Sequence, residues 1–215
     1  MSNVVVYTAM YGPHDNLKVQ PAITGVDYVC FTDQAINAPG WDVVKVQSSM
    51  PDRLAAKDPK MRPNRWVRRW RQSIWIDASV QILSPEFVPA AIGAMRDGLA
   101  FFAHPDRDCI YEESKVSIRM PKYNPTEIEG QVERYRAEGF PEHAGLWACG
   151  IIARDRKRSL NRLGQKWFDR SKDESGQDQI SLPPLLRSMR ITPGTIPGNL
   201  WDNEFIRVED HLRDS

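Results

Sequence analysis

A carboxylate placed directly after an apolar segment is the feature of this sequence most suited to chemistry. Ile74-Trp75-Ile76 runs into Asp77-Ala78-Ser79, so a buried strand is expected to expose the Asp77 side chain where it ends. Carboxylate oxygen is a hard ligand for Mg²⁺ or Mn²⁺, and a metal held there can bridge a diphosphate. The alternative is that Asp77 only forms a turn or caps a helix, which is common for an aspartate after a strand.

Positive charge is concentrated just before that carboxylate. The segment 53–71 contains one acidic residue, Asp58, and eight basic ones: Arg53, Lys57, Lys60, Arg62, Arg65, Arg68, Arg69 and Arg71. The whole chain carries a net charge of only +1, so the excess is local. Because clustered positive charge attracts anions, we predict that some of these arginines contact phosphate. The alternative is the solvated face of a core helix, since Trp66, Val67 and Trp70 fall on one helical side.

A second group of polar side chains begins a helix near residue 177. Ser175-Gly176-Gln177-Asp178-Gln179 places three polar residues after a glycine, where they can reach the hydroxyl groups of a ligand. The alternative is an ordinary helix start, because an acid in the first turn interacts favourably with the helix dipole. His104 follows the apolar segment 99–103 and can contribute a polar side chain to the same edge.

Short apolar segments alternate with amphipathic ones, which is typical of an α/β domain. Strands are expected at 4–7, 27–33, 41–46, 73–77, 99–103 and 146–153, and helices at 64–72, 85–97, 124–138, 160–170 and 177–189. They predict a mixed, mostly parallel sheet with helices on both faces, whose ligands bind at the carboxyl ends of the strands. Asp33 and Asp77 are expected at that edge. The domain is predicted to cover residues 1–190, with 191–215 as an irregular C-terminal tail that packs back on it.

The composition excludes several classes of protein. With 215 residues, 41 % of them hydrophobic, the chain is long enough to bury a core. No apolar run approaches the roughly 20 residues that cross a bilayer, and the first residues do not resemble a signal peptide. Three cysteines are too few for a disulfide scaffold. We therefore expect a cytoplasmic protein without a membrane span.

Taken in order, the motifs resemble those of a known family. They lie within residues 4–189: Tyr7 to Gly12, Phe31-Thr32-Asp33, Lys57 to Arg65, Ile74 to Ser79, His104 to Glu112, Trp147 to Ile152 and Gln177-Asp178-Gln179. This set resembles the glycosyltransferase-like domain family shared by bacterial and phage proteins and by plant mucilage and pollen proteins. More distantly, it resembles the glycogenin and lipopolysaccharide galactosyltransferase group.

The resemblance implies a GT-A type, Rossmann-like domain. Such a domain would transfer a sugar from a nucleotide diphosphate-sugar donor, for example a UDP-sugar, to a hydroxyl group of a carbohydrate or glycan acceptor. Polysaccharide biosynthesis is the process that this activity would serve.

The resemblance also implies roles for individual residues. The nucleotide would lie beside Thr8, Ala9, Tyr11 and Asp33, and its diphosphate beside Lys60 and Arg65. Asp77 would hold a Mn²⁺ or Mg²⁺ ion, with Ser79 beside it and His211 as the second ligand. The sugar would lie among His104, Trp147, Gly150, Gln177 and Gln179, with Asp178 as the catalytic residue.

One departure from the family pattern concerns the metal. Asp77-Ala78-Ser79 lacks the second carboxylate of an Asp-x-Asp motif, and a hydroxyl is a weaker ligand for a cation. The metal is therefore expected to bind weakly, to recruit His211, or to be replaced by the arginines of the basic segment. Guanidinium groups can neutralise a leaving diphosphate without a metal.

Two other functions stay open on the sequence alone. The missing carboxylate allows a catalytically inactive binder of nucleotide-sugars. The basic segment 53–71 allows a nucleic-acid-binding module, in which arginines contact phosphates and Trp66 or Trp70 stacks on bases. Because both tryptophans share the apolar helical side, core packing is favoured and no nucleic acid is expected as a partner.

Overall fold

The computed structural model describes residues 3–13 and 17–209. Seven strands form one sheet in the order β3-β2-β1-β4-β7-β6-β8, and β5 pairs separately with β9. The strands are β1 (Val4–Met10), β2 (Val26–Thr32), β3 (Asp42–Lys45), β4 (Gln72–Ile76), β5 (Val80–Ile82), β6 (Leu99–Ala103), β7 (Trp147–Asp155), β8 (Gly194–Thr195) and β9 (Ile206–Val208).

The sheet is mixed and mostly parallel, as predicted. β1 pairs in parallel with β2 and with β4, β2 pairs in parallel with β3, and β6 with β8. Only β7 runs against its neighbours, β4 and β6. The side chains of β1 alternate between two apolar clusters, with Val5 and Tyr7 on one face of the sheet and Val6 on the other. Both faces are therefore covered, as a parallel sheet requires.

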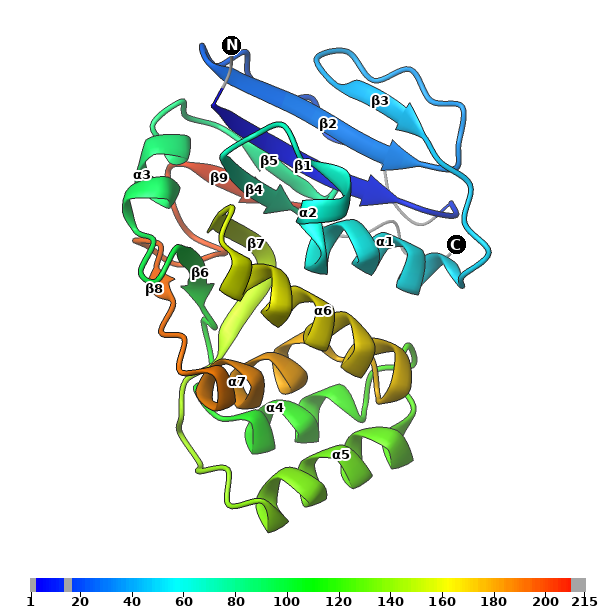
Figure 1. Cartoon of the computed structure of the whole chain (residues 1–215), viewed down its shortest axis with the longest axis vertical. Helices are drawn as coiled ribbons and strands as arrows, with labels where there is room; N and C mark the ends of the chain where they lie inside the picture. Colours follow the sequence, from blue (N-terminus) through cyan, green and yellow to red (C-terminus); the bar gives the residue numbers. More distant parts are fainter. Residues whose placement is uncertain (1–2, 14–16, 210–215) are drawn as a thin grey trace.

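The helices that cover the sheet lie on both of its faces. They are α1 (Asp52–Met61), α2 (Pro63–Trp66), α3 (Phe87–Gly93), α4 (Ile110–Ser117), α5 (Pro125–Ala137), α6 (Arg158–Asp173) and α7 (Asp178–Met189). Figure 1 shows α1 and α6 in front of the sheet, with α4 and α5 below α7. A third apolar cluster, which includes Ile110, Ile128 and Ile180, joins α4, α5 and α7. In the described part of the chain, no helix has the length and apolar character needed to cross a membrane.

The prediction of a helix over residues 64–72 is wrong for most of that range. Only α2 forms, and it ends at Trp66 because the chain then leads directly into β4. Trp70 is buried and its indole Nε1 donates to Asp27 Oδ2 at 2.7 Å. Two helices, α1 and α4, were not predicted. α1 contains Pro59 and buried charged residues, which local patterns do not associate with a helix.

Two short strands follow residue 190. β8 lies beside β6, and β9 pairs with β5, so both hydrogen-bond to strands from the first half of the chain. The domain boundary at 190/191 stays a prediction. His211 lies outside the described residues.

A glycine allows α6 to pack closely against α1. A Cβ built on Gly164 would lie 1.9 Å from the backbone oxygen of Met61, at the C-terminal end of α1. This distance is far inside van der Waals contact, so any side chain would force α1 away from α6. The contact matters for the site because Lys60 precedes Met61.

We expect Gly164→Ala to lower the free energy of unfolding by about 1–3 kcal/mol, because the added methyl group overpacks a backbone contact. Urea unfolding monitored by circular dichroism measures the change. Gly130→Ala in α5 is the matched control, since no atom lies within 4 Å of its added Cβ. That control should be stabilised by about 0.5–1 kcal/mol through helix propensity. Equal stability of the two variants would contradict the close contact between α1 and α6.

Candidate functional site

Asp77 follows the last residue of β4, and hydrogen bonds hold both its carboxylate and its backbone. The indole Nε1 of Trp75 donates to Asp77 Oδ1 at 2.7 Å, and the Asp77 backbone N–H donates to Gly150 O at 2.8 Å. The side chain is 34 % exposed, so one part of the carboxylate still faces solvent. The Asp77 side chain is therefore partly exposed at the point where β4 ends, as the sequence predicts.

An irregularity in β7 keeps the space beside Asp77 open. The pairing between β6 and β7 shifts register between Phe101 and Phe102, opposite the part of β7 that contains Gly150. A Cβ on Gly150 would lie 3.2 Å from Asp77 Oδ2. Bulges of this kind often redirect groups beside an active site. Here the absence of a side chain leaves Asp77 Oδ2 accessible.

Two lysines of α1 meet the acid that begins α7. Lys60 Nζ lies 2.8 Å from Asp178 Oδ2 and 3.4 Å from Asp77 Oδ1, so it bridges the two carboxylates. Lys57 Nζ is paired with Asp178 Oδ1 and also donates to Gly176 O at 2.5 Å. The residues Lys57, Lys60 and Asp178 are each less than 10 % exposed. Lysines of the basic segment therefore lie beside Asp77 in the structure, and the function of this group stays a prediction.

The pKa values of this group follow from burial and from the paired charges. Burial by itself would raise the pKa of Asp178, but Lys57 and Lys60 outweigh it and hold that pKa well below its usual range. Burial acts to lower the pKa of Lys60, whereas Asp178 and Asp77 raise it above its usual value. Asp178 is therefore an anion and Lys60 a cation at any physiological pH.

The start of α7 positions Asp178. The side chain of Gln177 caps the helix by accepting from the backbone N–H of Gln179 at 3.3 Å, and it donates to Ser117 Oγ at 2.8 Å. Gly176 adopts a positive φ of 68°, which suits glycine, and presents its carbonyl to Lys57. Gln177 is thus engaged within the protein, and its role as a sugar-binding residue stays a prediction, as does that of Gln179.

The connection between α4 and α5 adds two residues that sequence reasoning missed. The guanidinium of Arg53 lies 4.2 Å from the centre of the Tyr123 ring, and it donates to Lys122 O at 2.6 Å. Desolvation and the charge of Arg53 lower the pKa of Lys122, whereas Asp178 and Asp77 act to raise it. Lys122 therefore lies within electrostatic range of both carboxylates. It is flanked by Pro121 and Tyr123, and no sequence pattern marks it.

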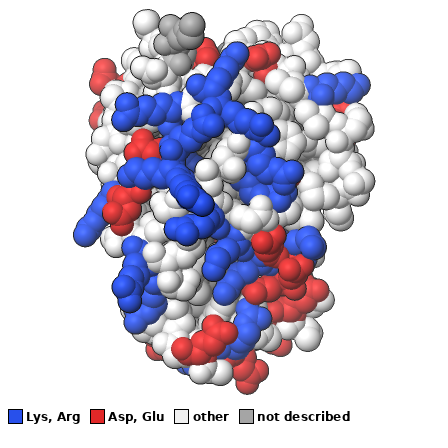
Figure 2. Space-filling view, in the orientation of Figure 1, with Lys and Arg blue, Asp and Glu red and all other residues white. Residues whose placement is uncertain are grey.

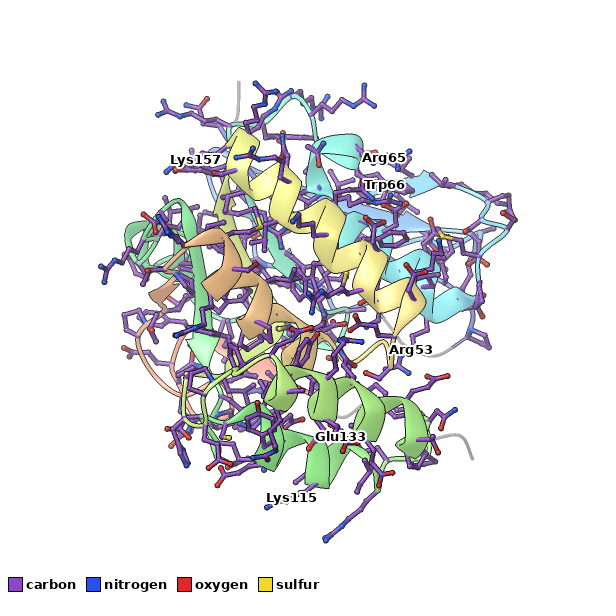
Figure 3. All side chains as sticks on the ribbon, turned by 60° about the horizontal axis from the view of Figure 1, so that its bottom comes forward. Arg53, Arg65, Trp66, Lys115, Glu133 and Lys157 are labelled. Carbon is purple, nitrogen blue, oxygen red and sulfur yellow. The ribbon has the colours of Figure 1, made fainter. Side chains whose placement is uncertain are left out.

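The cations of this site outnumber its acids. With all six groups ionised, Arg53, Lys57, Lys60 and Lys122 carry four positive charges and Asp77 and Asp178 two negative ones, although burial lowers the pKa of Lys57 and of Lys122. We call these six residues the lysine cluster. Its net charge of +2 is suited to a doubly charged anion. Figure 3 shows Arg53, near the beginning of α1, on the side facing α5.

The residues predicted to hold the nucleotide lie at the ends of β1 and β2. Thr8 is fully buried and its Oγ1 has no hydrogen-bond partner among the described residues. Tyr11 is also buried, and burial, together with the charges of Asp33 and Asp58, raises its pKa to about 12. One oxygen of Asp33, Oδ1, is buried without a hydrogen-bond partner in the described part of the chain. Ala9, which lies between Thr8 and Tyr11 in the sequence, is also buried. The contacts of these four residues with a nucleotide stay predictions.

His104 and Trp147 take part in contacts within the protein. Two backbone N–H groups, those of Asp106 and Arg107, donate to His104 Nδ1 at 3.2 Å each, which leaves Nε2 to carry the proton of the neutral ring. Burial lowers the pKa of His104, although Glu113 opposes this. The Trp147 ring packs against Phe101 with centroids 6.4 Å apart. Their proposed contacts with the sugar stay predictions.

The arginines of the basic segment do not gather on the lysine cluster. Arg62 pairs with Asp58 at 2.6 Å and packs over the Phe168 ring. Arg65 is exposed on α2, and no contact joins it to Asp77 or Asp178 within the described ranges. Figure 2 shows Lys and Arg side chains spread over the region of α2 and the start of α6. The indole of Trp66 donates to Asp58 at 3.2 Å, which favours the core interpretation over base stacking.

The described residues offer few ligands for a metal at Asp77. Ser79 is buried, and Asp178 already pairs with two lysines. A separate exposed group consists of Asp108, Glu112 and His143, whose ligand atoms all lie within 4.8 Å of one another. His143 Nδ1 and Asp108 Oδ1 are 2.6 Å apart. Exposed acidic groups of this kind are common without an ion.

Comparisons with known proteins give one family match and one distant structural similarity. The family model described as "TOD1/MUCI70, glycosyltransferase-like domain" matches residues 1–204. No curated protein matches the sequence. A solved structure described as the apo form of the bifunctional glycosyltransferase WbbM is similar, with 11 % identity and a TM-score of 0.48 over 91 % of this chain. The match covers 38 % of the WbbM chain, so this chain spans well under half of its length.

The pairing of Asp178 predicts a specific dependence of stability on pH. Because the folded-state pKa of Asp178 lies below its unfolded value of about 3.9, its contribution is present above that pH and is lost as the pH falls further. We expect Asp178→Asn to lower the free energy of unfolding at pH 7 by about 3–5 kcal/mol, since two buried lysines lose their partner. Urea unfolding at pH 7 and at pH 3 gives the free energy of unfolding at each pH. The decrease in this free energy between pH 7 and pH 3 should be smaller in the variant than in the wild type.

Asp173→Asn is the control, because Asp173 is exposed and, in the part of the chain that the structure describes, pairs only with the adjacent Lys172. It should change stability by less than about 0.5 kcal/mol and keep the acid dependence of the wild type. If Asp178→Asn behaves like this control, the buried ion pairs do not exist as described.

Proposed function

We propose that this chain, which belongs to the TOD1/MUCI70 glycosyltransferase-like domain family, transfers a sugar from a nucleotide diphosphate-sugar to an acceptor hydroxyl group. The family supports a glycosyltransferase role in general. The observation that carries the finer proposal is the lysine cluster beside Asp77, whose net positive charge is opposite in sign to the charge of a diphosphate. A carbohydrate or glycan is the acceptor that we propose.

The cluster supports the step in which the donor loses its diphosphate. As the bond from the anomeric carbon to the diphosphate breaks, negative charge grows on the leaving oxygens. Ammonium groups already fixed in place stabilise this charge without reorganising at the moment of reaction. Lys60 is suited to this because its Nζ is held between Asp77 and Asp178 and stays charged. Lys122, from the connection between α4 and α5, and Arg53 of α1 supply further positive charge.

Asp178 acts in this proposal by positioning the lysines. Its two carboxylate oxygens are taken by Lys57 and Lys60, and its lowered pKa makes it a poor acceptor of a proton. The resemblance placed Asp178 at the reacting face of the sugar. The contacts support a different role, in which its negative charge keeps two ammonium groups side by side despite their repulsion.

A tightly bound divalent metal does not fit the described residues well. Asp77 Oδ1 accepts from Trp75 and faces Lys60, so Oδ2 is the carboxylate oxygen that stays accessible. The nearest second carboxylate, Asp178, is neutralised by its lysines. The ammonium group of Lys60 lies where it would repel a cation. We therefore propose that these lysines stabilise the leaving group and that Mn²⁺ or Mg²⁺ is dispensable or weakly bound.

Asp33 and Tyr11 support the placement of the nucleoside. A buried carboxylate oxygen without a partner is costly, and the N–H of a base or the hydroxyl of a ribose would satisfy Asp33 Oδ1. Both residues lie at the carboxyl-end edge of parallel strands β1 and β2, as Asp77 does for β4. Ligands of α/β sheets bind at this edge.

Binding of UDP tests the proposal directly. We expect isothermal titration to detect UDP binding with or without Mn²⁺, and Lys60→Met to weaken it about 10- to 100-fold, because a charge-assisted hydrogen bond is lost. Lys166→Met removes an equal charge from the exposed face of α6 and should bind like the wild type. Absence of UDP binding under both conditions would contradict the proposed function.

Gly150→Ala tests the space beside Asp77. The added Cβ would lie 3.2 Å from Asp77 Oδ2, so we expect it to weaken UDP-sugar binding and slow turnover at least about 3-fold while the fold stays intact. Gly93→Ala, whose Cβ meets no atom within 4 Å, is the control. Release of UDP from a UDP-sugar over long incubation gives turnover. A wild type that binds UDP but releases none from any donor would be the inactive binder.

A further inference from the structure

Arg154 is buried at the end of β7 without the partners that a buried arginine needs. It is 6 % exposed, and its one side-chain hydrogen bond within the described residues runs from Nη1 to Met61 O at 3.4 Å. Nε and Nη2 are both buried without a partner there. These two nitrogens form one edge of the guanidinium, the edge that commonly binds a carboxylate or phosphate with two parallel hydrogen bonds.

No carboxylate of the described residues neutralises Arg154. Burial lowers its pKa, and the groups that oppose this effect are Tyr7 and Cys149. The adjacent Asp155 is engaged elsewhere, since it accepts from Gln72 Nε2 at 3.1 Å and lies 3.7 Å from Lys157 Nζ. A buried charge without a counter-ion destabilises the fold. A negatively charged ligand would supply the counter-ion that Arg154 lacks.

Arg154 lines a surface pocket with mixed walls. Polar and basic side chains form one part of it, namely Asn64, Arg71, Ser73, Arg156 and Asn161, and the rest consists of Asp155 and the apolar residues Pro63, Val67, Trp70 and Leu160. The N-terminal end of α6 forms part of this wall, and α6 has neither a side-chain cap nor an acid in its first turn. Its free N–H groups and its dipole add to the positive potential. Figure 3 places Arg65 and Lys157 on either side of this end of α6.

The pocket is separate from the lysine cluster. Ser73 lies at the beginning of β4 and Asp77 beyond its end, so four residues of extended chain separate them by roughly 13 Å. Buried apolar side chains, including Tyr7 and Trp75, occupy this face of the sheet. A ligand in the Arg154 pocket therefore does not have to displace a ligand at Asp77.

We infer that the Arg154 pocket is a second anion-binding site, which takes the phosphate group of a ligand. A phosphate dianion offers two oxygens to the Nε and Nη2 edge of Arg154 and a third to the hydroxyl of Ser73 or the amide of Asn161. Arg71 and Arg156 balance the remaining charge at the pocket mouth. The shared chemistry is a phosphate monoester dianion, present in free phosphate and in a phosphorylated carbohydrate.

Thermal unfolding with millimolar inorganic phosphate tests this inference. Phosphate should raise the melting temperature of the wild type more than chloride does at equal ionic strength. Arg154→Met should melt at the same temperature as the wild type or higher without phosphate, because a buried unpaired charge is replaced by an apolar side chain. Its melting temperature should respond to phosphate less than that of the wild type, because only the lysine cluster remains to bind the dianion.

Arg162→Met is the matched control, since Arg162 is exposed on α6 and does not line the pocket. It should keep the response to phosphate. Arg71→Gln is a second, surface variant and should weaken phosphate binding in isothermal titration about 3- to 10-fold while folding normally. A wild type without a phosphate-specific response, or an Arg154→Met variant that keeps it in full, would overturn the inference.

Three further titrations identify the ligand. Glucose 6-phosphate binding tighter than inorganic phosphate assigns the pocket to phosphorylated carbohydrates, whereas the reverse assigns it to free phosphate. UDP at saturation should leave phosphate binding to this pocket unchanged, and Asp77→Asn should retain it. A single-stranded oligonucleotide that binds Arg154→Met as tightly as the wild type, with no displacement by phosphate, would assign the surface to a nucleic acid and overturn the inference.

Discussion

The ion pairs of Asp178 with Lys57 and Lys60 are the interaction on which the candidate site depends. They join the first helix of the chain to a helix that begins more than a hundred residues later, and all three side chains are buried. Two buried ammonium groups cannot stay adjacent without an anion between them. The same pairs fix Lys60 beside Asp77 at the end of β4. Stability and ligand recognition therefore rest on one set of charges, and changes in Asp178 affect both.

Two glycines make this arrangement sterically possible. Gly164 lets α6 approach the end of α1, where Lys60 lies, and Gly150 leaves room at the Asp77 carboxylate where the pairing of β7 is irregular. Gly164 allows a close approach to the backbone of Met61, and Gly150 allows one to the carboxylate of Asp77. Such close approaches leave little freedom for α1 and β7 to move relative to one another.

The basic segment divides its charges between two regions of one sheet face. Its lysines turn inward to carboxylates, whereas several of its arginines lie around α2 and the start of α6 (Figure 2). Lysine presents a compact charge that carboxylates can surround, and arginine offers a planar fork suited to oxyanions. The division explains why the chain is nearly neutral overall and still has two places with unbalanced positive charge.

Local sequence patterns determined six of the strands, the alternation of strands with helices, and the position of Asp77 at a strand end, but not the short strands β5, β8 and β9. β6 lies at the predicted residues 99–103, because apolar runs and turn residues act over a few positions. The resemblance named Lys60 and Asp178 as site residues. Only the tertiary structure decided that these two bind each other, that Lys122 joins them, and that Arg154 has no counter-ion. The reason is physical: α1 is a helix of buried charges with an internal proline, and its stability comes from partners far away in the chain that no local pattern records.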